Sequence, residues 1–368
     1  MRRAVLMVVA ALVAGVAAVL GPARAEEEKL LSVYNWSDYV APDTLQNFTA
    51  ETGIKVNYDT YDKNEMLSAK LTAGRSGYDV VFPSASPHLA LQIKAGLYQK
   101  LNKSKLTNLG NMDPKVLEVL AVSDPGNLYG VPYMVSATGF GYNVAMVAKA
   151  LPGARTESWA MLFDPATTAK LKGCGVTLLD DPVEVLPAAL AYMGRQGVSL
   201  SADDLKASAE TVTKVRPNLK YIHSSNYIND LANGDICVAH GYVGDLAQAR
   251  KRAEEAGKGV RIAITIPKEG AILNVDAMAI PADAPHPDNA HRFIDYMMRP
   301  KVIADITNAV GYASANSASM ALVDKAIRED PAIYPPAEVR ARTFIVPVPN
   351  QDFERARNRA WMKIRTGK

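Results

Sequence analysis

The segment that decides the fold runs from Leu30 to Ser86 and reads LLSVYNWSDYVAPDTLQNFTAETGIKVNYDTYDKNEMLSAKLTAGRSGYDVVFPSAS. Three short runs within it are rich in β-branched and aromatic residues, as β-strands are: Leu30–Tyr34, Ile54–Tyr58 and Tyr78–Phe82. The longer intervals between these runs carry signals that start and stop helices. The order strand, helix, strand, helix, strand predicts an α/β fold with a mostly parallel sheet and helices on both of its faces.

Residues at the ends of the two intervals predict where the helices begin and end. Pro42 lies where a first helical turn tolerates proline, and Gly53 ends that helix. Asp62 and Glu65 have the spacing of a capping box, and Gly74 closes the second helix. We therefore expect both helices to be short and to return the chain to the same end of the sheet.

Polar and aromatic residues follow the predicted strands. Asn35-Trp36-Ser37-Asp38-Tyr39 comes after the first strand, and Pro83-Ser84-Ala85-Ser86 comes after the third. Ligands of open α/β sheets bind beyond the carboxyl ends of the strands, so these two groups are candidate ligand residues. A capped helix start, with Trp36 packed in the core, explains the first group equally well.

Acidic residues mark three further places in the second half of the chain. Asp180, Asp181 and Glu184 lie between a strand predicted at Cys174–Leu179 and a following helix, where carboxylates also favour a helix N-terminus without any ligand. Asp245 follows the strand-like Ile236–Ala239, and Asp276 precedes the apolar Ala277–Ile280. Burying a carboxylate is costly unless a cation or a hydrogen-bond donor meets it, so Asp276 is the strongest of these candidates.

The length of 368 residues exceeds what one core usually supports, so we expect two domains. Two stretches are candidates for the passages between them: Tyr133–Tyr142, which contains two glycines, and the region from about Lys251 to Arg261. Short crossings of this kind leave a cleft between domains and permit hinge motion.

The first 25 residues predict the compartment. Arg2 and Arg3 precede an apolar run from Ala4 to Leu20, and Ala23-Arg24-Ala25 then supplies a small-residue cleavage site, the pattern of a secretory signal peptide. Removal of this leader takes three arginines from the 41 basic residues and leaves 38 against 38 acidic ones. A chain without net charge offers no electrostatic footprint for nucleic acid or an anionic membrane. We expect the mature protein to work outside the cytoplasm, as a monomer that does not insert into the membrane.

The chain has two cysteines, Cys174 and Cys237. An oxidising compartment favours a disulfide between them, and two buried free thiols are the alternative. Neither cysteine has a neighbour at metal-ligand spacing, so a metal site is not expected, and no cofactor is expected.

Several segments together resemble the periplasmic polyamine-binding proteins of bacterial ABC importers. They are YNWSDY (34–39), VFPSAS (81–86), VPYM (131–134), HSSNYINDLANGDICVA (223–239), IPKEGA (266–271) and IYPPAEVRA (333–341). The resemblance implies a type II periplasmic binding protein fold, in which two α/β lobes joined by crossing hinge segments close around one ligand and deliver it to an inner-membrane ABC permease. The division it suggests is a first lobe of residues 26–135 plus about 255–310, and a second of about 136–254 plus 311–368. It also implies a Cys174–Cys237 disulfide.

The resemblance further implies a set of ligand-binding residues, namely Trp36, Ser37, Asp38, Tyr39, Ser84, Glu184, Ser224, Tyr242, Asp245, Asp276 and Tyr312. Carboxylates and hydroxyls suit the terminal ammonium groups of a polyamine, and aromatic rings suit its methylene chain. Asp181 and Asn274 are added because they depart from the pattern of putrescine receptors. They suggest a longer or differently functionalised amine, such as spermidine, a guanidino amine or another diamine, and spermidine or putrescine is the leading expectation.

Other functions fit the sequence less well. A guanidino amine or a cadaverine-like diamine could occupy the same fold, and a ferric-ion receptor could use some of the sixteen tyrosines. An enzyme is not expected, because the chain has no G-x-S-x-G, H-E-x-x-H or Walker A motif.

Overall fold

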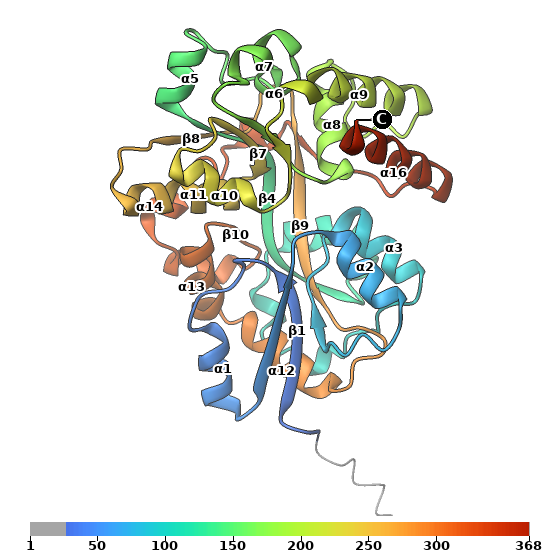
Figure 1. Cartoon of the computed structure of the whole chain (residues 1–368). Coiled ribbons are helices and arrows are strands. Elements are labelled where there is room, and N and C mark those ends of the chain that lie inside the picture. Colours follow the sequence, from blue (N-terminus) through green and yellow to red (C-terminus); the bar gives the residue numbers. More distant parts are fainter. Residues whose placement is uncertain (1–26, 368) are drawn as a thin grey trace, which may run out of the picture.

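A computed structural model describes residues 27–367 of the chain. The predicted signal peptide, residues 1–25, lies outside the described residues. Two α/β lobes lie one above the other in Figure 1, and strands β4 (Gly130–Asn143) and β9 (Ala271–Ala279) run from one lobe into the other. These two strands pair antiparallel over most of their shared length, so they form a two-stranded connection between the lobes.

The first lobe is built on the segment that predicted the fold. Strands β1 (Leu30–Trp36), β2 (Lys55–Tyr61) and β3 (Val80–Val81) pair parallel, with β1 in the middle. The sheet order is β2-β1-β3-β9-β4-β7-β5-β6, so β9 and β4 separate the parallel strands of the two lobes. The expected α/β class, with parallel strands in each lobe, is confirmed.

The second lobe contains a matching set of strands, β5 (Val176–Leu178), β6 (Tyr221–Ile222) and β7 (Val238–Tyr242), with β5 parallel to both neighbours. Strand β8 (Ile262–Thr265) and the two-residue strands β10 and β11, at residues 313–314 and 343–344, complete the sheet. The helices are α1 Thr44–Thr52, α2 Asn64–Thr72, α3 Ala90–Lys94, α4 Pro114–Ala121, α5 Val144–Ala150, α6 Ala160–Phe163, α7 Pro165–Leu171, α8 Pro182–Tyr192, α9 Ala202–Val215, α10 Asn226–Asn233, α11 Val243–Ala256, α12 Pro287–Met297, α13 Pro300–Val310, α14 Lys325–Arg328, α15 Ala337–Arg340 and α16 Gln351–Thr366.

Each lobe has its own hydrophobic core. The core of the second lobe includes Phe140, Trp159 and Leu246, whereas Phe48, Tyr133 and Phe293 belong to a core of the first lobe. Two separate cores mean that the lobes can change their relative position with little disturbance of their interiors.

The strand pairing differs from the division of the chain suggested above. Strand β8 pairs with Phe140–Asn143 in the second lobe, although residues 255–310 were expected in the first. Strand β10 pairs with Val135 and Met134 in the first lobe, although residues from 311 onward were expected in the second. The second crossing is β9 rather than the region from Lys251 to Arg261, because that region finishes α11 at Gly257 and turns into β8.

The predicted helix ends are partly correct. Gly53 adopts a left-handed conformation with φ 72°, and its N–H caps the carbonyl of Thr49, as expected for a glycine that ends a helix. The capping box of Asp62 and Glu65 is not formed, because Lys63 is the residue that precedes α2 and no side chain caps this helix. The Asp62 carboxylate instead contacts the hydroxyl of Ser225 at 3.4 Å.

The disulfide between Cys174 and Cys237 is present, with the two Cα atoms 5.4 Å apart. It joins the loop before β5 to the residue before β7, and β5 and β7 are neighbours in the sheet. The bond therefore lies at the amino ends of these two strands, at the opposite edge of the sheet from the carboxyl ends that lead to the cavity.

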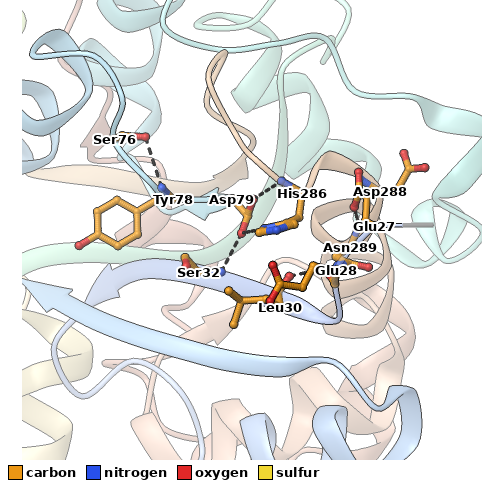
Figure 2. Close-up of polar contacts among 10 residues, drawn as sticks. All are labelled: Glu27, Glu28, Leu30, Ser32, Ser76, Tyr78, Asp79, His286, Asp288 and Asn289. Carbon is orange, nitrogen blue, oxygen red and sulfur yellow. Dashed lines mark hydrogen bonds and ion pairs between the residues drawn. The ribbon is translucent and has the colours of Figure 1, made fainter. Parts of the chain in front are cut away.

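The start of the described chain is held by the first lobe (Figure 2). The Glu27 carboxylate accepts hydrogen bonds from the backbone N–H groups of Asp288 and Asn289, at the first turn of α12. The Asn289 amide donates to the carbonyls of Glu28 and Leu30. A carboxylate at a helix N-terminus is favourable, so this contact fixes the beginning of β1 against α12.

Among residues 27–367, no helix has both the length and the apolar composition needed to cross a bilayer.

Candidate ligand-binding site

A cavity of about 180 Å³ lies between the two lobes. Its walls come from the ends of β1, β2 and β3 in the first lobe, from α10 and α11 in the second, and from β9 between them. Eleven of the thirteen predicted ligand residues line it: Trp36, Ser37, Asp38, Tyr39, Ser84, Ser224, Tyr242, Asp245, Asn274, Asp276 and Tyr312. Residues that are distant in sequence thus meet beyond the carboxyl ends of the strands, where the ligands of open α/β sheets bind.

Asp276 forms one polar end of the cavity. It lies on β9 and is 9 % exposed. The hydroxyl of Tyr39 donates to its Oδ2 atom at 2.6 Å, and that of Ser84 donates to its Oδ1 atom at 2.6 Å. Burial raises the pKa of Asp276 to about 6, although both hydroxyls act in the opposite direction. The carboxylate is therefore ionised at neutral pH and retains lone pairs for a further donor.

Asp245 forms a second polar end and is built in the same way. It lies in the first turn of α11 and accepts hydrogen bonds from the hydroxyls of Tyr227 and Tyr312, each at 2.7 Å. Burial raises the pKa of Asp245 to about 6 against the effect of both hydroxyls. Tyr312 packs in the core of the first lobe, so its hydrogen bond to Asp245 joins the lobes. Gly244 makes this possible, because a Cβ atom there would come within 2.1 Å of the Tyr312 ring.

Aromatic rings form the walls between these ends. The Trp36 indole N–H donates to the carbonyl of Phe82 at 2.8 Å, which fixes the ring, and its centroid lies 6.5 Å from that of Tyr242. Tyr39 and Tyr312 meet edge to face with centroids 4.7 Å apart. Trp36 also packs against the core, as the core interpretation predicted, and it lines the cavity.

The rim of the cavity carries an ion pair between the lobes. A guanidinium nitrogen of Arg252, on α11, lies 3.2 Å from the carboxylate of Asp38, which is half exposed. Gln248 also reaches the backbone carbonyl of Asp38, at 3.4 Å. Asp38 thus belongs to the mouth of the site, and its charge is already paired.

Asp181 and Glu184 do not line the cavity, contrary to expectation. Asp181 caps α8 by accepting a hydrogen bond from the N–H of Val183 at 2.7 Å, so the helix-cap interpretation is correct for this residue. Glu184 is buried behind Asn274, whose side-chain amide donates to it at 3.0 Å, and it also accepts from Thr138. Burial, followed by the nearby charge of Asp181, raises the pKa of Glu184 to about 8, so this group holds a proton at neutral pH.

Several lining residues were not predicted. They include Tyr61, Asp62, Ser136, Ser225, Asn226, Asn229 and Arg252. Tyr61 ends β2 and Asp62 follows it, so the expectation that ligands bind beyond the carboxyl ends of strands could have found them if Asp62 had not been assigned to a helix cap. Arg252 lies three turns into α11, and nothing in the local sequence distinguishes it from a solvated helix residue.

The arrangement suits an elongated organic cation. Two buried carboxylates from different elements offer acceptors to donors at two places, and aromatic faces between them favour both apolar chain and positive charge. A buried anion would meet these carboxylates without compensation. Within residues 27–367, no group of three or more His, Cys, Asp and Glu side chains is placed to hold a metal ion.

Comparison with known proteins places this geometry in context. Residues 43–335 match the family model described as bacterial extracellular solute-binding protein. The chain is 50 % identical to the putrescine-binding periplasmic protein PotF of Escherichia coli, over 94 % of this chain and 93 % of that protein. It is 51 % identical to the putrescine-binding periplasmic protein SpuD of Pseudomonas aeruginosa, over 95 % of each. The solved structure of the spermidine/putrescine ABC transporter substrate-binding protein PotD of Streptococcus pneumoniae is similar, with a TM-score of 0.74 and 26 % identity, over 92 % of this chain and 99 % of that one.

Proposed function

The chain belongs to the bacterial extracellular solute-binding proteins, and we propose that it is a periplasmic receptor that captures a polyamine between its two lobes and delivers it to an ABC importer. The observation that carries this proposal is the pair of buried carboxylates, Asp276 and Asp245, at two ends of an aromatic cavity. The names of the two putrescine-binding relatives support the same ligand class.

The binding mode follows from the hydrogen bonds already made. Each carboxylate receives two hydroxyl hydrogens and keeps acceptor capacity for one ammonium group. A charge-assisted hydrogen bond contributes roughly 1.5–3 kcal/mol, and each methylene buried between the rings adds about 0.8 kcal/mol. The ligand would thus be recognised by its charged ends, with the rings of Trp36 and Tyr242 covering its chain.

The choice among polyamines rests on the residues beside Asp276. Asn274 presents an amide to the cavity, and both hydrogens of that amide are directed at Thr138 and Glu184. Its oxygen is therefore the atom available to a ligand, which favours an amine with a donor along its chain, such as spermidine or a guanidino amine. Asp181 no longer supports this choice, because it lies outside the cavity.

The site is a receptor site rather than a catalytic one in this proposal. Closure would involve the movement of two lobes about β4 and β9, with the ligand and the Asp38–Arg252 pair closing the mouth. A signal peptide, a monomeric state and an inner-membrane permease as partner belong to the same proposal. The signal peptide and the permease are supported by relatives named as periplasmic and ABC-transporter proteins.

Isothermal titration calorimetry with putrescine, cadaverine, spermidine and the guanidino amine agmatine tests the proposal. Saturable binding of at least one of them, with glutamate and γ-aminobutyrate inactive, is the expected result. An iron titration followed by absorbance is the control for a ferric-ion receptor. If all four amines fail to bind to the correctly folded protein, the proposed function is rejected.

A further inference from the structure

A second contact between the lobes lies outside the ligand cavity, around Asp180. This carboxylate is 4 % exposed and receives three donors. The indole N–H of Trp361 donates to it at 2.9 Å, and a guanidinium nitrogen of Arg365 lies 3.0 Å from it. Both residues belong to α16, the C-terminal helix on the outside of the second lobe (Figure 1).

The third donor comes from the first lobe. The ammonium group of Lys63, at the start of α2, hydrogen-bonds to the other carboxylate oxygen of Asp180. Lys63 does not line the cavity, and its side chain is largely buried by this contact. The pair is therefore an ion pair across the lobe boundary, shielded from water more than the Asp38–Arg252 pair at the rim.

Short connections link this contact to the cavity. The backbone N–H of Asp180 donates to the hydroxyl of Ser224 at 3.1 Å, and Ser224 lines the cavity. On the other side, Asp62 precedes Lys63 in the chain, also lines the cavity and touches Ser225. Any movement that separates the lobes must pull Lys63 away from Asp180, while the bonds of Asp180 to α16 remain within one lobe.

The charges around this contact are mixed, because Glu65 on α2 also lies near the like-charged Asp180 and Asp181, and Lys63 is the cation of the first lobe that pairs with Asp180. Glu65 on α2 interacts electrostatically with Arg357 of α16, which is 5 % exposed, and Arg357 also interacts with Asp181. Arg357 and Lys63 are thus positive groups among the carboxylates at the boundary between α2 and α16. The basic face of α16 is accordingly not simply solvated, as its composition alone would indicate.

We propose that Lys63 and Asp180 form a latch of the closed receptor, made without direct contact to the ligand, and that this latch transmits lobe closure to α16. The part that concerns ligand affinity rests on the proposed function. The latch holds every bound ligand equally, because it stabilises the closed form and not a particular amine. Its strength should appear in the dissociation rate.

Lys63→Met tests the latch, since it removes the cross-lobe charge and leaves Asp180 with its two partners on α16. Affinities for putrescine and spermidine should each fall by about three- to tenfold, with their ratio unchanged and with faster dissociation. Lys301→Met is the matched control, because Lys301 pairs with Asp305 on the surface of α13. It should leave affinity unchanged.

Fluorine NMR with 5-fluorotryptophan tests transmission to α16, because the chain has three tryptophans in distinct places. In the wild type, spermidine should shift the resonances of Trp36, in the cavity, and of Trp361, at Asp180. In Lys63→Met the Trp361 shift should be lost while the Trp36 shift persists. Trp159, whose indole donates to Gly270 in the second-lobe core, should not move.

Two results would overturn the latch: an unchanged dissociation rate in Lys63→Met, or an identical Trp361 response in variant and wild type. If the wild type bound no polyamine, the proposed function would be refuted. The latch would be refuted with it, because it is a contact of the closed, ligand-bound receptor.

Discussion

Replacement of Asp276 by asparagine should weaken polyamine binding strongly and leave the fold intact. The substitution keeps the size of the side chain but removes the charge that a buried ammonium group would meet. Asparagine also carries an NH₂ group in place of one carboxylate oxygen, so either Tyr39 or Ser84 loses its acceptor and must rotate to accept instead.

The size of the effect follows from these contacts. Truncating one partner of a buried charged pair costs about 2–5 kcal/mol, much of it from leaving the other charge unpaired. The Ser84 and Tyr39 hydroxyls remain and can still interact with the ammonium group, which reduces the loss of binding free energy. We therefore expect a loss of about 2–4 kcal/mol, or a dissociation constant roughly 30- to 1000-fold higher. Calorimetry at pH 7.5 with putrescine and spermidine measures it.

The ligand-free protein should respond in the opposite direction. Because burial raises the pKa of Asp276 to about 6, the ionised carboxylate destabilises the folded state at neutral pH. Asp276→Asn should therefore leave the unfolding temperature unchanged or raise it by about 2 °C.

Asp181→Asn is the matched control for the binding measurement, since burial raises the pKa of Asp181 to about 6 as well, but this residue caps α8 away from the cavity. It should change affinity less than about twofold, because asparagine is an equally good cap. Unaltered binding by Asp276→Asn would refute the assignment of this residue to the site.

Four further predictions concern the same cavity. Lowering the pH from 7.5 to 5 should weaken binding by about tenfold for each of Asp276 and Asp245, because protons compete with the ligand for carboxylates whose pKa is about 6. Calorimetry across this range measures the affinity, and an affinity independent of pH would contradict the prediction. The stability of the ligand-free protein should show the opposite dependence on pH. The contribution of Asp276 and Asp245 to the free energy of unfolding is fully present below the unfolded pKa of about 4 and is lost as the pH rises through 6. Denaturant unfolding at several pH values measures this. Gly244→Ala should reduce affinity by roughly tenfold or more, because the added Cβ atom displaces Tyr312, whereas Gly173→Ala meets no atom within 4 Å and serves as the control. Tyr312→Phe should cost only about 0.5–1.5 kcal/mol of binding, since the ring stays and Tyr227 still donates to Asp245; a loss as large as that of Asp276→Asn would show that the hydroxyl itself holds the ligand.

The local pattern of the first lobe is sufficient to predict much of the fold. Residues 30–86 contain the alternating strands, the glycine that ends α1 and both polar groups that reach the cavity. These features are local, because strand propensity and helix caps depend on neighbouring residues. The pairing of β8 and β10 with opposite halves of β4 is not local, and no periodicity of residues 255–320 reveals it.

The site shows the same division between local and long-range information. Asp276 stands out in the sequence because it lies among apolar strand residues, and it is buried in the structure with two hydroxyl donors. Glu184 has an equally suggestive position after a strand, yet Asn274, ninety residues later, screens it from the cavity. Which acid faces the ligand is decided by side chains that the local sequence does not contain.

Glu27 binds the first turn of α12 in the first lobe, and α16 lies on the second lobe, which has a practical consequence (Figures 1 and 2). The two ends of the described chain are held by different lobes, so the distance between them would change with the proposed closure. A pair of fluorescent proteins fused to these ends would turn ligand capture into an optical signal, with no label placed near the cavity.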